Sequence, residues 1–485
     1  MRIIKGTAMK RVLSVASEAV PLVKTGGLAD VVGALPEALA GQGWEMRVML
    51  PAYRGVLDRL AATTVVWSDP DLFGGPAEVH LGKVGTMEVM ALSAPHLYDR
   101  AGGPYSDLHG DFGDNAERFA ALCWAAAAVA REGAEDWRPD VLHAHDWQGA
   151  LAPAYLRYAG ASLPSLITIH NMAFQGRVGA DKMGALRLPR EAFHRDGYEF
   201  WGDISTLKAG LTTADAITTV SPRYAEELMR GEYGQGLEGV IAARAGVVVG
   251  ILNGIDDRVW NPETDPECIS FSVTNISGKS KNRKALQAEF QLEKKIDEPL
   301  VILVSRLTAQ KGIDLLPPAV EELVARGGAL ALLGSGDSWA EDLVRGLAAR
   351  FPGRVGVRIG YDESLSHRMF AGADAVLVPS RFEPCGLTQL YGLRYGCLPL
   401  VSAVGGLADT VIGASPASLA GQAATGVVFH PVDALALRQG MRQLCDLHAD
   451  RRIWTAMMKR AMKSDLGWSR SAARYAALYE RLLAR

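Results

Sequence analysis

The chain has 485 residues, which is too long for one ordinary hydrophobic core, so we expect two or three domains. Apolar residues make up 48% of the sequence, which is enough for large buried cores and excludes a mainly disordered chain. The formal net charge of −3 at pH 7 shows no excess of basic residues. We therefore expect neither a nucleic acid nor a membrane as a partner.

Cysteine usage and the N-terminus favour a cytoplasmic protein. The cysteines form no CxxC pair and indicate neither a disulfide framework nor a zinc site: Cys123, Cys268, Cys385, Cys397 and Cys445. The opening sequence MRIIKGTAMK lacks the apolar segment of a secretory signal, and translation starts at Met1 or Met9. The longest apolar run, 119–130, is shorter than the about 20 residues that a membrane-spanning helix needs.

Short apolar, β-branched runs recur along the chain, and each is followed by a longer helical pattern. The runs are 11–15, 47–50, 141–143, 166–169 and 216–220 in the first half, and 300–304, 329–333, 355–359, 375–378 and 398–401 in the second. Continuous apolar runs are typical of strands buried on both faces. The alternation with helices therefore predicts an α/β protein with parallel sheets and helices on both faces.

The domain boundary is expected near the middle of the chain, where 246–262 is rich in Gly, Asn, Asp and Pro. Ser221 and Pro222 mark a helix start, as N-cap and first helical residue. The last residues have apolar side chains at helical spacing. We predict domains at 1–250 and 251–465, followed by an amphipathic terminal helix at 466–485.

The sequence GGLAD occurs twice, once in each half, at Gly26-Gly27 and at Gly405-Gly406. The repeat is either coincidence or a sign of two similar nucleotide-binding halves. Adjacent glycines before a helix let backbone N–H groups approach a phosphate, and Lys24 adds a cation. A glycine pair beside a lysine also occurs in ordinary turns. The pattern matches neither the P-loop nor GxGxxG.

Charged residues follow two predicted strands of the second half. Arg306 and Lys311 follow 300–304, where two cations suit a diphosphate leaving group, although such pairs are often only solvated. Glu383 follows 375–378, between Phe382 and Pro384, where its carboxylate can bind sugar hydroxyls or balance charge at an anomeric carbon.

The residues after Glu383 complete this motif. Gly386-Leu387-Thr388 open a predicted helix whose N–H groups can meet phosphate. Cys385 has no evident partner histidine for nucleophilic catalysis, so we interpret it as a small residue near the site. Tyr361 ends the strand at 355–359 and is interpreted either as a residue that stacks on a base or as a partly buried core tyrosine.

Polar residues also end two predicted strands of the first half. Asp146 lies in the sequence HAHDW after 141–143, and His170-Asn171 follow 166–169. The pair His143 and His145 can bind metal in other folds, but no further ligand cluster matches it, so we expect no metal here. A lone histidine at a strand end is more often structural, but polar groups at two neighbouring strand ends favour a site, and Asp146 is interpreted as a sugar contact.

Together, these motifs and their neighbours resemble bacterial glycogen synthases and plant starch synthases. The resemblance rests on KTGGLADVVGALP (24–36), HAHDWQ (143–148), ITIHNMAFQG (167–176), ILNGIDDRVWNP (251–262), VSRLTAQKGID (304–314), PSRFEPCGLTQLYGLRYG (379–396) and GGLADTV (405–411). It implies two Rossmann-like domains facing across a cleft, the GT-B type, with a terminal helix that returns to the first domain. It also implies retaining transfer of glucose from ADP-glucose to the non-reducing end of an α-1,4-glucan such as glycogen, without metal or cofactor.

The resemblance further implies roles for the residues singled out above. It assigns catalytic roles to Glu383, Lys311, Arg306, His170 and Asp146. It assigns substrate binding to Lys24, Gly26, Gly27, Asp30, Asn171, Tyr361, Cys385, Gly386, Leu387 and Thr388. Within these sets, Lys24 contacts the donor diphosphate and Tyr361 stacks on adenine.

Three other functions are weighed against this one. A transferase of the same fold that uses UDP-glucose or makes a disaccharide shares most of the motifs. A non-catalytic glucan-binding protein is disfavoured by the intact charged residues. An NAD-dependent dehydrogenase is set aside because Gly334-Ser335-Gly336 lacks the third glycine.

Overall fold

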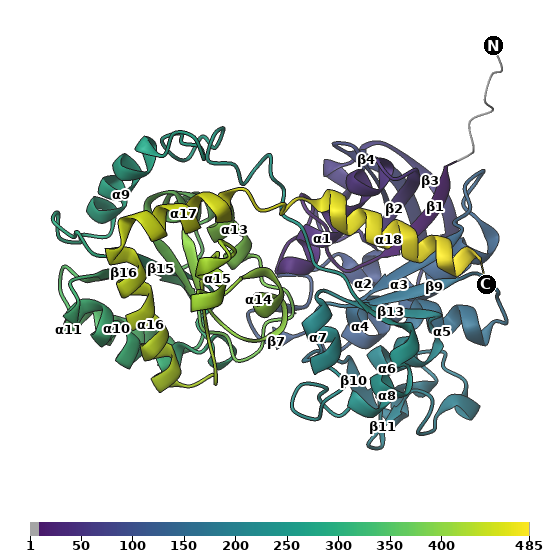
Figure 1. Cartoon of the computed structure of the whole chain (residues 1–485). Coiled ribbons are helices and arrows are strands. Elements are labelled where there is room, and N and C mark those ends of the chain that lie inside the picture. The colour runs from purple at the N-terminus through teal and green to yellow at the C-terminus, as the bar shows by residue number, and fades with distance from the viewer. Residues whose placement is uncertain (1–8, 485) are drawn as a thin grey trace, which may run out of the picture. The chain divides into compact units, whose positions relative to one another are not determined.

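The computed structural model describes residues 9–484 (Figure 1). The first eight residues, on which the predictions about a secretory signal and Met1 rest, lie outside the described residues. The chain forms two compact units. The first unit extends to Gly254 and also contains the chain from Trp468 onward, and the second unit is Ile255–Gly467. Among the described helices, none combines the length and the apolar character needed to cross a membrane.

The first unit is built on one large, mostly parallel sheet of nine strands in the order β14-β13-β9-β8-β1-β2-β5-β4-β3. Neighbours from β14 to β5 are parallel, whereas β4 is antiparallel to both β5 and β3. The strands are β1 (Lys10–Val15), β2 (Trp44–Pro51), β3 (Ala61–Asp69), β4 (Ala77–Val84), β5 (Met87–Ser93), β8 (Val141–His145), β9 (Ser165–Ile169), β13 (Ala216–Thr219) and β14 (Val248–Gly250).

Helices cover both faces of this sheet because alternate strand residues point to opposite sides. Val12 of β1 packs in the apolar cluster of α1 and α18, whereas Leu13 packs in the cluster of α3, α5 and α6. Figure 1 shows α18, in yellow, on the same side as α1. The helices longer than four residues are α1 (Gly27–Ala40), α3 (Asn115–Glu132), α5 (Leu151–Tyr158), α6 (Thr206–Thr213), α7 (Pro222–Glu227), α8 (Glu238–Ala243) and α18 (Trp468–Leu483).

The second unit contains an entirely parallel sheet of six strands in the order β17-β16-β15-β18-β19-β20. Its strands are β15 (Leu300–Val304), β16 (Ala329–Gly334), β17 (Val355–Ile359), β18 (Ala375–Val378), β19 (Leu398–Ser402) and β20 (Val427–Phe429). Its helices are α9 (Ser277–Glu289), α10 (Leu316–Ala325), α11 (Ser338–Arg350), α12 (Glu363–Gly372), α13 (Thr388–Arg394), α14 (Gly405–Thr410), α15 (Pro416–Ala420), α16 (Ala434–Ala449) and α17 (Arg451–Met462).

The predicted α/β class is confirmed, and all ten predicted strands exist. The predicted helix start is also confirmed, because the Ser221 hydroxyl accepts a hydrogen bond from the backbone N–H of Tyr224. The predicted strands did not include β3, β4, β5 and β14 of the first sheet or β20 of the second. β3 begins with five exposed residues and β4 alternates in burial, so neither contains a continuous apolar run.

Both sheets reverse their strand order beside their first strand. In chain order, the second sheet reads 3-2-1-4-5-6, and the parallel part of the first sheet follows the same scheme with one further strand. The reversal lies between β1 and β8 in the first unit and between β15 and β18 in the second. Open α/β sheets bind ligands outside the carboxyl ends of the strands at this switch point. The residues that follow these strands are therefore the place to search for a site.

Candidate active site

A lysine–glutamate pair lies at the switch point of the second sheet. Lys311 is the last residue of a short 3-10 turn after β15, and Glu383 follows β18. The Lys311 Nζ atom lies 2.5 Å from Oε2 of Glu383, and the Ser380 hydroxyl donates to the same oxygen at 2.8 Å. Both side chains of the pair are largely buried, with exposed fractions of 17% and 9%. The carboxylate is therefore fixed by two donors at the strand edge.

The backbone around Lys311 is held in a conformation that glycine permits. Gly312 follows with a φ of +67°, in the left-handed region. A Cβ at this position would lie 2.2 Å from the carbonyl oxygen of Pro379, which precedes the Glu383 loop. The loops after β15 and β18 therefore touch through a position that only glycine fits.

Arg306 lies on the same loop as Lys311 but in a different environment. Its side chain is exposed, and the guanidinium makes no ion pair with any residue that the structure describes. The structure thus places the two predicted cations on one strand edge and engages only Lys311 with Glu383. Arg306 keeps its donors available for an anion from solution.

The second GGLAD copy supports the Glu383 loop. The N–H of Gly406 donates to the carbonyl oxygens of Glu383 and Pro384, each at 3.1 Å. Cβ atoms at Gly405 and Gly406 would lie 2.0 Å from the Glu383 carbonyl oxygen and 2.2 Å from that of Cys385. These two glycines therefore allow α14 to pack tightly against the loop.

The first GGLAD copy has different surroundings. A Cβ at Gly26 or Gly27 would meet no atom within 4 Å. Both copies begin a helix, as predicted, but only the first leaves its glycine backbone open. The two copies therefore lie at corresponding helix starts in two similar sheets, but the second is packed against the Glu383 loop and only the first leaves its backbone open.

The segment from Cys385 to Thr388 leads into α13. Cys385 is buried, Gly386 has a φ of +72°, and Thr388 is the first residue of the helix. The amide of Gln389 donates to the carbonyl oxygens of Cys385 at 3.0 Å and Gly386 at 2.9 Å. Gln389 is fully buried and fixes this turn, and the sequence reading did not single it out.

Tyr361 follows β17 and projects from the surface of the second unit. Its side chain is 78% exposed, and its hydroxyl donates to Oε2 of Glu363 at 2.6 Å. The alternative of a partly buried core tyrosine is therefore wrong. An exposed ring beyond a strand end is accessible to a planar ligand.

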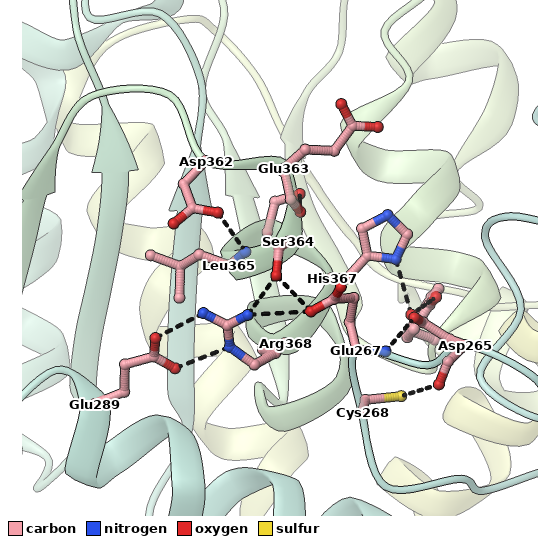
Figure 2. Close-up of polar contacts among 12 residues, drawn as sticks. Asp265, Glu267, Cys268, Glu289, Asp362, Glu363, Ser364, Leu365, His367 and Arg368 are labelled. Carbon is pink, nitrogen blue, oxygen red and sulfur yellow. Dashed lines mark hydrogen bonds and ion pairs between the residues drawn. The ribbon is translucent and has the colours of Figure 1, made fainter.

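The helix after Tyr361 is firmly attached to its surroundings (Figure 2). Asp362 caps α12 by accepting the N–H of Leu365 at 2.8 Å. Arg368 donates to both carboxylate oxygens of Glu289 on α9, at 2.8 and 3.1 Å. His367 Nδ1 lies 2.8 Å from Oδ2 of Asp265. The helix that follows Tyr361 is therefore held to α9 and to Asp265 by side-chain contacts.

Asp146 lies at the switch point of the first sheet, directly after β8. Its φ is +50°, which is uncommon outside glycine and indicates a constrained position. Its Oδ1 accepts the backbone N–H of His170 at 2.6 Å and that of Asn171 at 3.4 Å. The predicted proximity of these residues is confirmed. Burial raises the pKa of the Asp146 carboxyl to about 7, although these hydrogen bonds act in the opposite direction.

Histidine side chains line the same strand ends. His145 Nδ1 lies 3.0 Å from His170 Nε2, and His145 Nε2 lies 3.1 Å from the Ser14 hydroxyl. The two nitrogens of His143 contact the hydroxyls of Tyr479, at 2.8 Å, and Thr168, at 2.6 Å. The His143-His145 pair is therefore part of a hydrogen-bonded network of protein groups.

The loop after β1 carries Lys24 and the open glycines. Lys24 Nζ lies 2.9 Å from Oδ1 of Asp30 in α1. The loop is held by Glu18, whose carboxylate accepts the Thr25 hydroxyl at 2.6 Å and also bonds the Tyr105 hydroxyl. The sequence reading missed Glu18, although an acidic residue soon after a buried strand was a usable signal. Glu18 also contributes to the raised pKa of Asp146.

A separate pocket of about 540 Å³ lies in the first unit. It includes Trp67, Trp124 and Tyr158 in its walls, together with Arg187, whose guanidinium lies 4.6 Å from the centre of the Trp124 ring. None of the predicted site residues lines it. The pocket is therefore distinct from the residues gathered at the two switch points.

Two Rossmann-type sheets with cations, carboxylates and polar strand ends at their switch points define a glycosyltransferase of the GT-B class. Family models agree: the starch synthase catalytic domain matches residues 11–243, and glycosyl transferases group 1 matches 286–460. The chain belongs to the glycogen synthase family.

Similarity to individual proteins supports the assignment to this family. The chain is 58% identical over 480 residues to a glycogen synthase of Cereibacter sphaeroides, covering 99% of this chain and all of that one. It is 57% identical to a glycogen synthase of Jannaschia sp., covering 97% and 99%. The catalytic domain of Starch Synthase IV from Arabidopsis thaliana, solved with ADP and acarbose, is similar with a TM-score of 0.88 at 29% identity, covering 99% and 100%.

Proposed function

We propose that the chain transfers glucose from ADP-glucose to the non-reducing end of an α-1,4-glucan, with retention, during glycogen synthesis. The observation that carries the proposal is the Lys311–Glu383 pair at the switch point of the second sheet. The binding of ADP and acarbose by the starch synthase relative supports a nucleotide donor and a saccharide acceptor. The free cysteines suit a cytoplasmic setting.

On the donor side, the cations stabilise the leaving ADP. As the bond between the glucose C1 atom and the diphosphate breaks, negative charge grows on the phosphate oxygens and positive charge grows on the sugar. Lys311 and the accessible Arg306 stabilise the negative charge on the phosphate, while the Glu383 carboxylate balances the positive charge on the sugar. Lys24 and the open backbone at Gly26-Gly27 add phosphate contacts, with Asp30 orienting Lys24.

The remaining second-unit residues bind the donor without taking part in bond cleavage. The exposed ring of Tyr361 stacks on adenine. The turn of Cys385, Gly386, Leu387 and Thr388 lies against the glucose and phosphate groups, in a backbone conformation fixed by Gln389.

On the glucose side, Asp146, His170 and Asn171 bind sugar hydroxyls. Asp146 Oδ2 has no hydrogen bond to any residue that the structure describes, yet it is not sealed from solvent. A sugar hydroxyl can donate to this oxygen. The acceptor hydroxyl forms the new bond to C1 on the face that the diphosphate leaves, and its proton passes to the departing phosphate.

Incorporation of labelled glucose tests the proposal. Purified full-length protein is incubated with glycogen and ADP-[14C]glucose or UDP-[14C]glucose, and both precipitated glucan and released nucleotide are measured. We expect incorporation that prefers ADP-glucose, with Glu383→Gln folded but inactive. Glucan binding without nucleotide release indicates a non-catalytic protein, and a small soluble product indicates a disaccharide synthase. No incorporation from any nucleotide-glucose refutes the proposal.

A further inference from the structure

Three side chains from three neighbouring strands form a continuous hydrogen-bonded chain. Ser14 lies inside β1, His145 is the last residue of β8, and His170 follows β9. The Ser14 hydroxyl lies 3.1 Å from His145 Nε2, and His145 Nδ1 lies 3.0 Å from His170 Nε2. Ser14 and His145 are fully buried, whereas His170 is only partly buried. This hydrogen-bonded chain of side chains therefore runs from the interior of the sheet to its ligand-binding edge.

The positions of the protons give this hydrogen-bonded chain a direction. A hydrogen bond between two neutral imidazoles needs one N–H and one lone pair, so the two tautomers are linked. Among the described residues, His145 is the sole hydrogen-bond partner of the Ser14 hydroxyl. A buried hydroxyl proton without an acceptor is costly, so Ser14 donates to His145 Nε2. His145 then carries its proton on Nδ1 and donates to His170 Nε2, which leaves the His170 proton on Nδ1.

We propose that Ser14 and His145 are positioning residues that fix His170 as its Nδ1–H tautomer, so that His170 presents a hydrogen-bond donor to a sugar oxygen. This inference rests on the proposed function for its sugar ligand. Neither Nδ1 of His170 nor Oδ2 of Asp146 is sealed from solvent or bonded to a described residue. A fixed donor on His170 complements the acceptor on Asp146, and together they match the acceptor and donor atoms of sugar hydroxyls.

The hydrogen-bonded chain requires that His145 and His170 are both neutral, and their buried surroundings favour this state. Burial lowers the pKa of His170 to about 3 and that of His145 well below its ordinary value. His143 lies beside the chain, with its ring centre 4.2 Å from that of His145. Its nitrogens bond to Thr168 and Tyr479 instead. Thr168 therefore belongs to a parallel network that packs against the chain without sharing its protons.

This arrangement supplies a matched pair of variants. Ser14→Ala removes the terminal donor, whereas Thr168→Val removes a hydroxyl of the parallel network with little change in volume. The full-length protein is labelled with 15N-histidine, and the tautomer of His170 is read from its ring nitrogen shifts, with His170→Ala used for assignment. We expect the Nδ1–H form in the wild type and in Thr168→Val, and a tautomer mixture in Ser14→Ala.

Kinetics provide the second readout. Loss of a fixed neutral donor should lower kcat/KM for ADP-glucose about two- to tenfold in Ser14→Ala, with Thr168→Val unchanged. In a double-mutant cycle, Ser14→Ala should have no further effect once His170 is alanine, because Ser14 acts through that ring. If Ser14→Ala does not fold, His145→Phe keeps a ring and removes both nitrogens, and the same cycle applies.

Several results overturn the inference. These are an Nε2–H tautomer of wild-type His170, an unchanged tautomer in Ser14→Ala, an equal kinetic loss in Thr168→Val, or an additive effect of Ser14→Ala and His170→Ala. The tautomer measurement needs no substrate. An inactive wild type with the expected tautomers would therefore contradict the proposed function and leave the coupling of Ser14, His145 and His170 intact.

Discussion

The Lys311 ammonium lies 2.5 Å from a carboxylate oxygen of Glu383, although 72 residues separate them in sequence. Their strands, β15 and β18, are neighbours because the second sheet reverses its order between them. The pair therefore joins the cation proposed for the leaving diphosphate to the carboxylate proposed for the sugar. When the diphosphate gains charge, Lys311 is already oriented at the site and needs little reorganisation.

Replacing Lys311 with alanine should lower kcat by about a hundredfold or more, because a preorganised charge at the leaving group is lost. The variant also leaves the Glu383 carboxylate largely buried and without its cation, so a modest loss of thermal stability should accompany it. Initial rates with ADP-glucose and glycogen, and the melting temperature of the same preparation, provide the measurements.

The matched control is Arg345→Ala, which removes a surface cation from α11 that pairs with Glu341 at 2.8 Å. Its kcat should stay within about twofold of the wild type, since exposed ion pairs contribute little. Turnover of Lys311→Ala at the wild-type rate would remove the role proposed for this cation.

The two GGLAD copies predict different effects of one added methyl group on stability. In Gly406→Ala, the new Cβ would lie 2.2 Å from the Cys385 carbonyl oxygen, so the loop must shift. We expect destabilisation by about 1–3 kcal/mol and a lower kcat, because Glu383 moves with the loop.

In Gly27→Ala, the new methyl group meets no protein atom within 4 Å, so the melting temperature should remain at the wild-type value. If the backbone there binds phosphate, KM for ADP-glucose should rise while kcat is retained. Thermal unfolding and a donor titration measure both variants. Equal destabilisation by the two alanines would contradict the contrast between a packed and an open glycine pair.

The terminal helix makes a specific polar contact within the first unit. The Tyr479 hydroxyl lies 2.8 Å from Nδ1 of His143, and both residues are fully buried. Tyr479→Phe leaves this nitrogen without a partner and should cost about 1–3 kcal/mol, measured as a lower midpoint of thermal unfolding. Glu480→Gln, on the exposed side of the same helix, alters only the pair with Lys10 and should change the midpoint little. A Tyr479→Phe midpoint equal to that of Glu480→Gln would contradict the predicted contribution.

Much of the fold was predictable because strands buried on both faces are continuous apolar runs. The run 300–304 matches β15 residue for residue. The edge strand β3 and its neighbour β4 expose part of their residues and carry no such signal. Domain assignment from sequence remains a prediction, although the structure places Trp468–Leu483 in the same compact unit as α1.

The site was predictable where a polar residue directly follows an apolar run, as Asp146 and Glu383 do. The contact between Lys311 and Glu383 was harder to predict, because it depends on the order of the strands in the sheet, which the sequence does not state. Ser14 was missed for another reason. A serine within the mostly buried strand KRVLSV looks like an ordinary core residue in the sequence. Only the structure shows that its hydroxyl lies beside His145.

Asp146 gives a pH prediction because burial raises its carboxyl pKa to about 7. If the carboxylate accepts a sugar hydroxyl, kcat/KM should rise as the pH increases through about 7, and Asp146→Asn should lose this inflection at a lower activity. Asparagine tolerates the positive φ at this position and can still accept the N–H of His170. Asp215→Asn, which changes a carboxylate that accepts the N–H of Ser165 at the amino end of β9, should keep the inflection.

The same carboxyl also links stability to pH. Its folded pKa lies above the ordinary value of 3.8, so between pH 3.8 and about 7 the folded state holds a proton that the unfolded state has released. The stabilisation from this proton is complete below pH 3.8 and is lost as the pH rises through about 7. Asp146→Asn removes this loss, so its melting temperature relative to the wild type should increase from pH 4 to pH 8. A difference that stays constant over this range would show that Asp146 has an ordinary pKa.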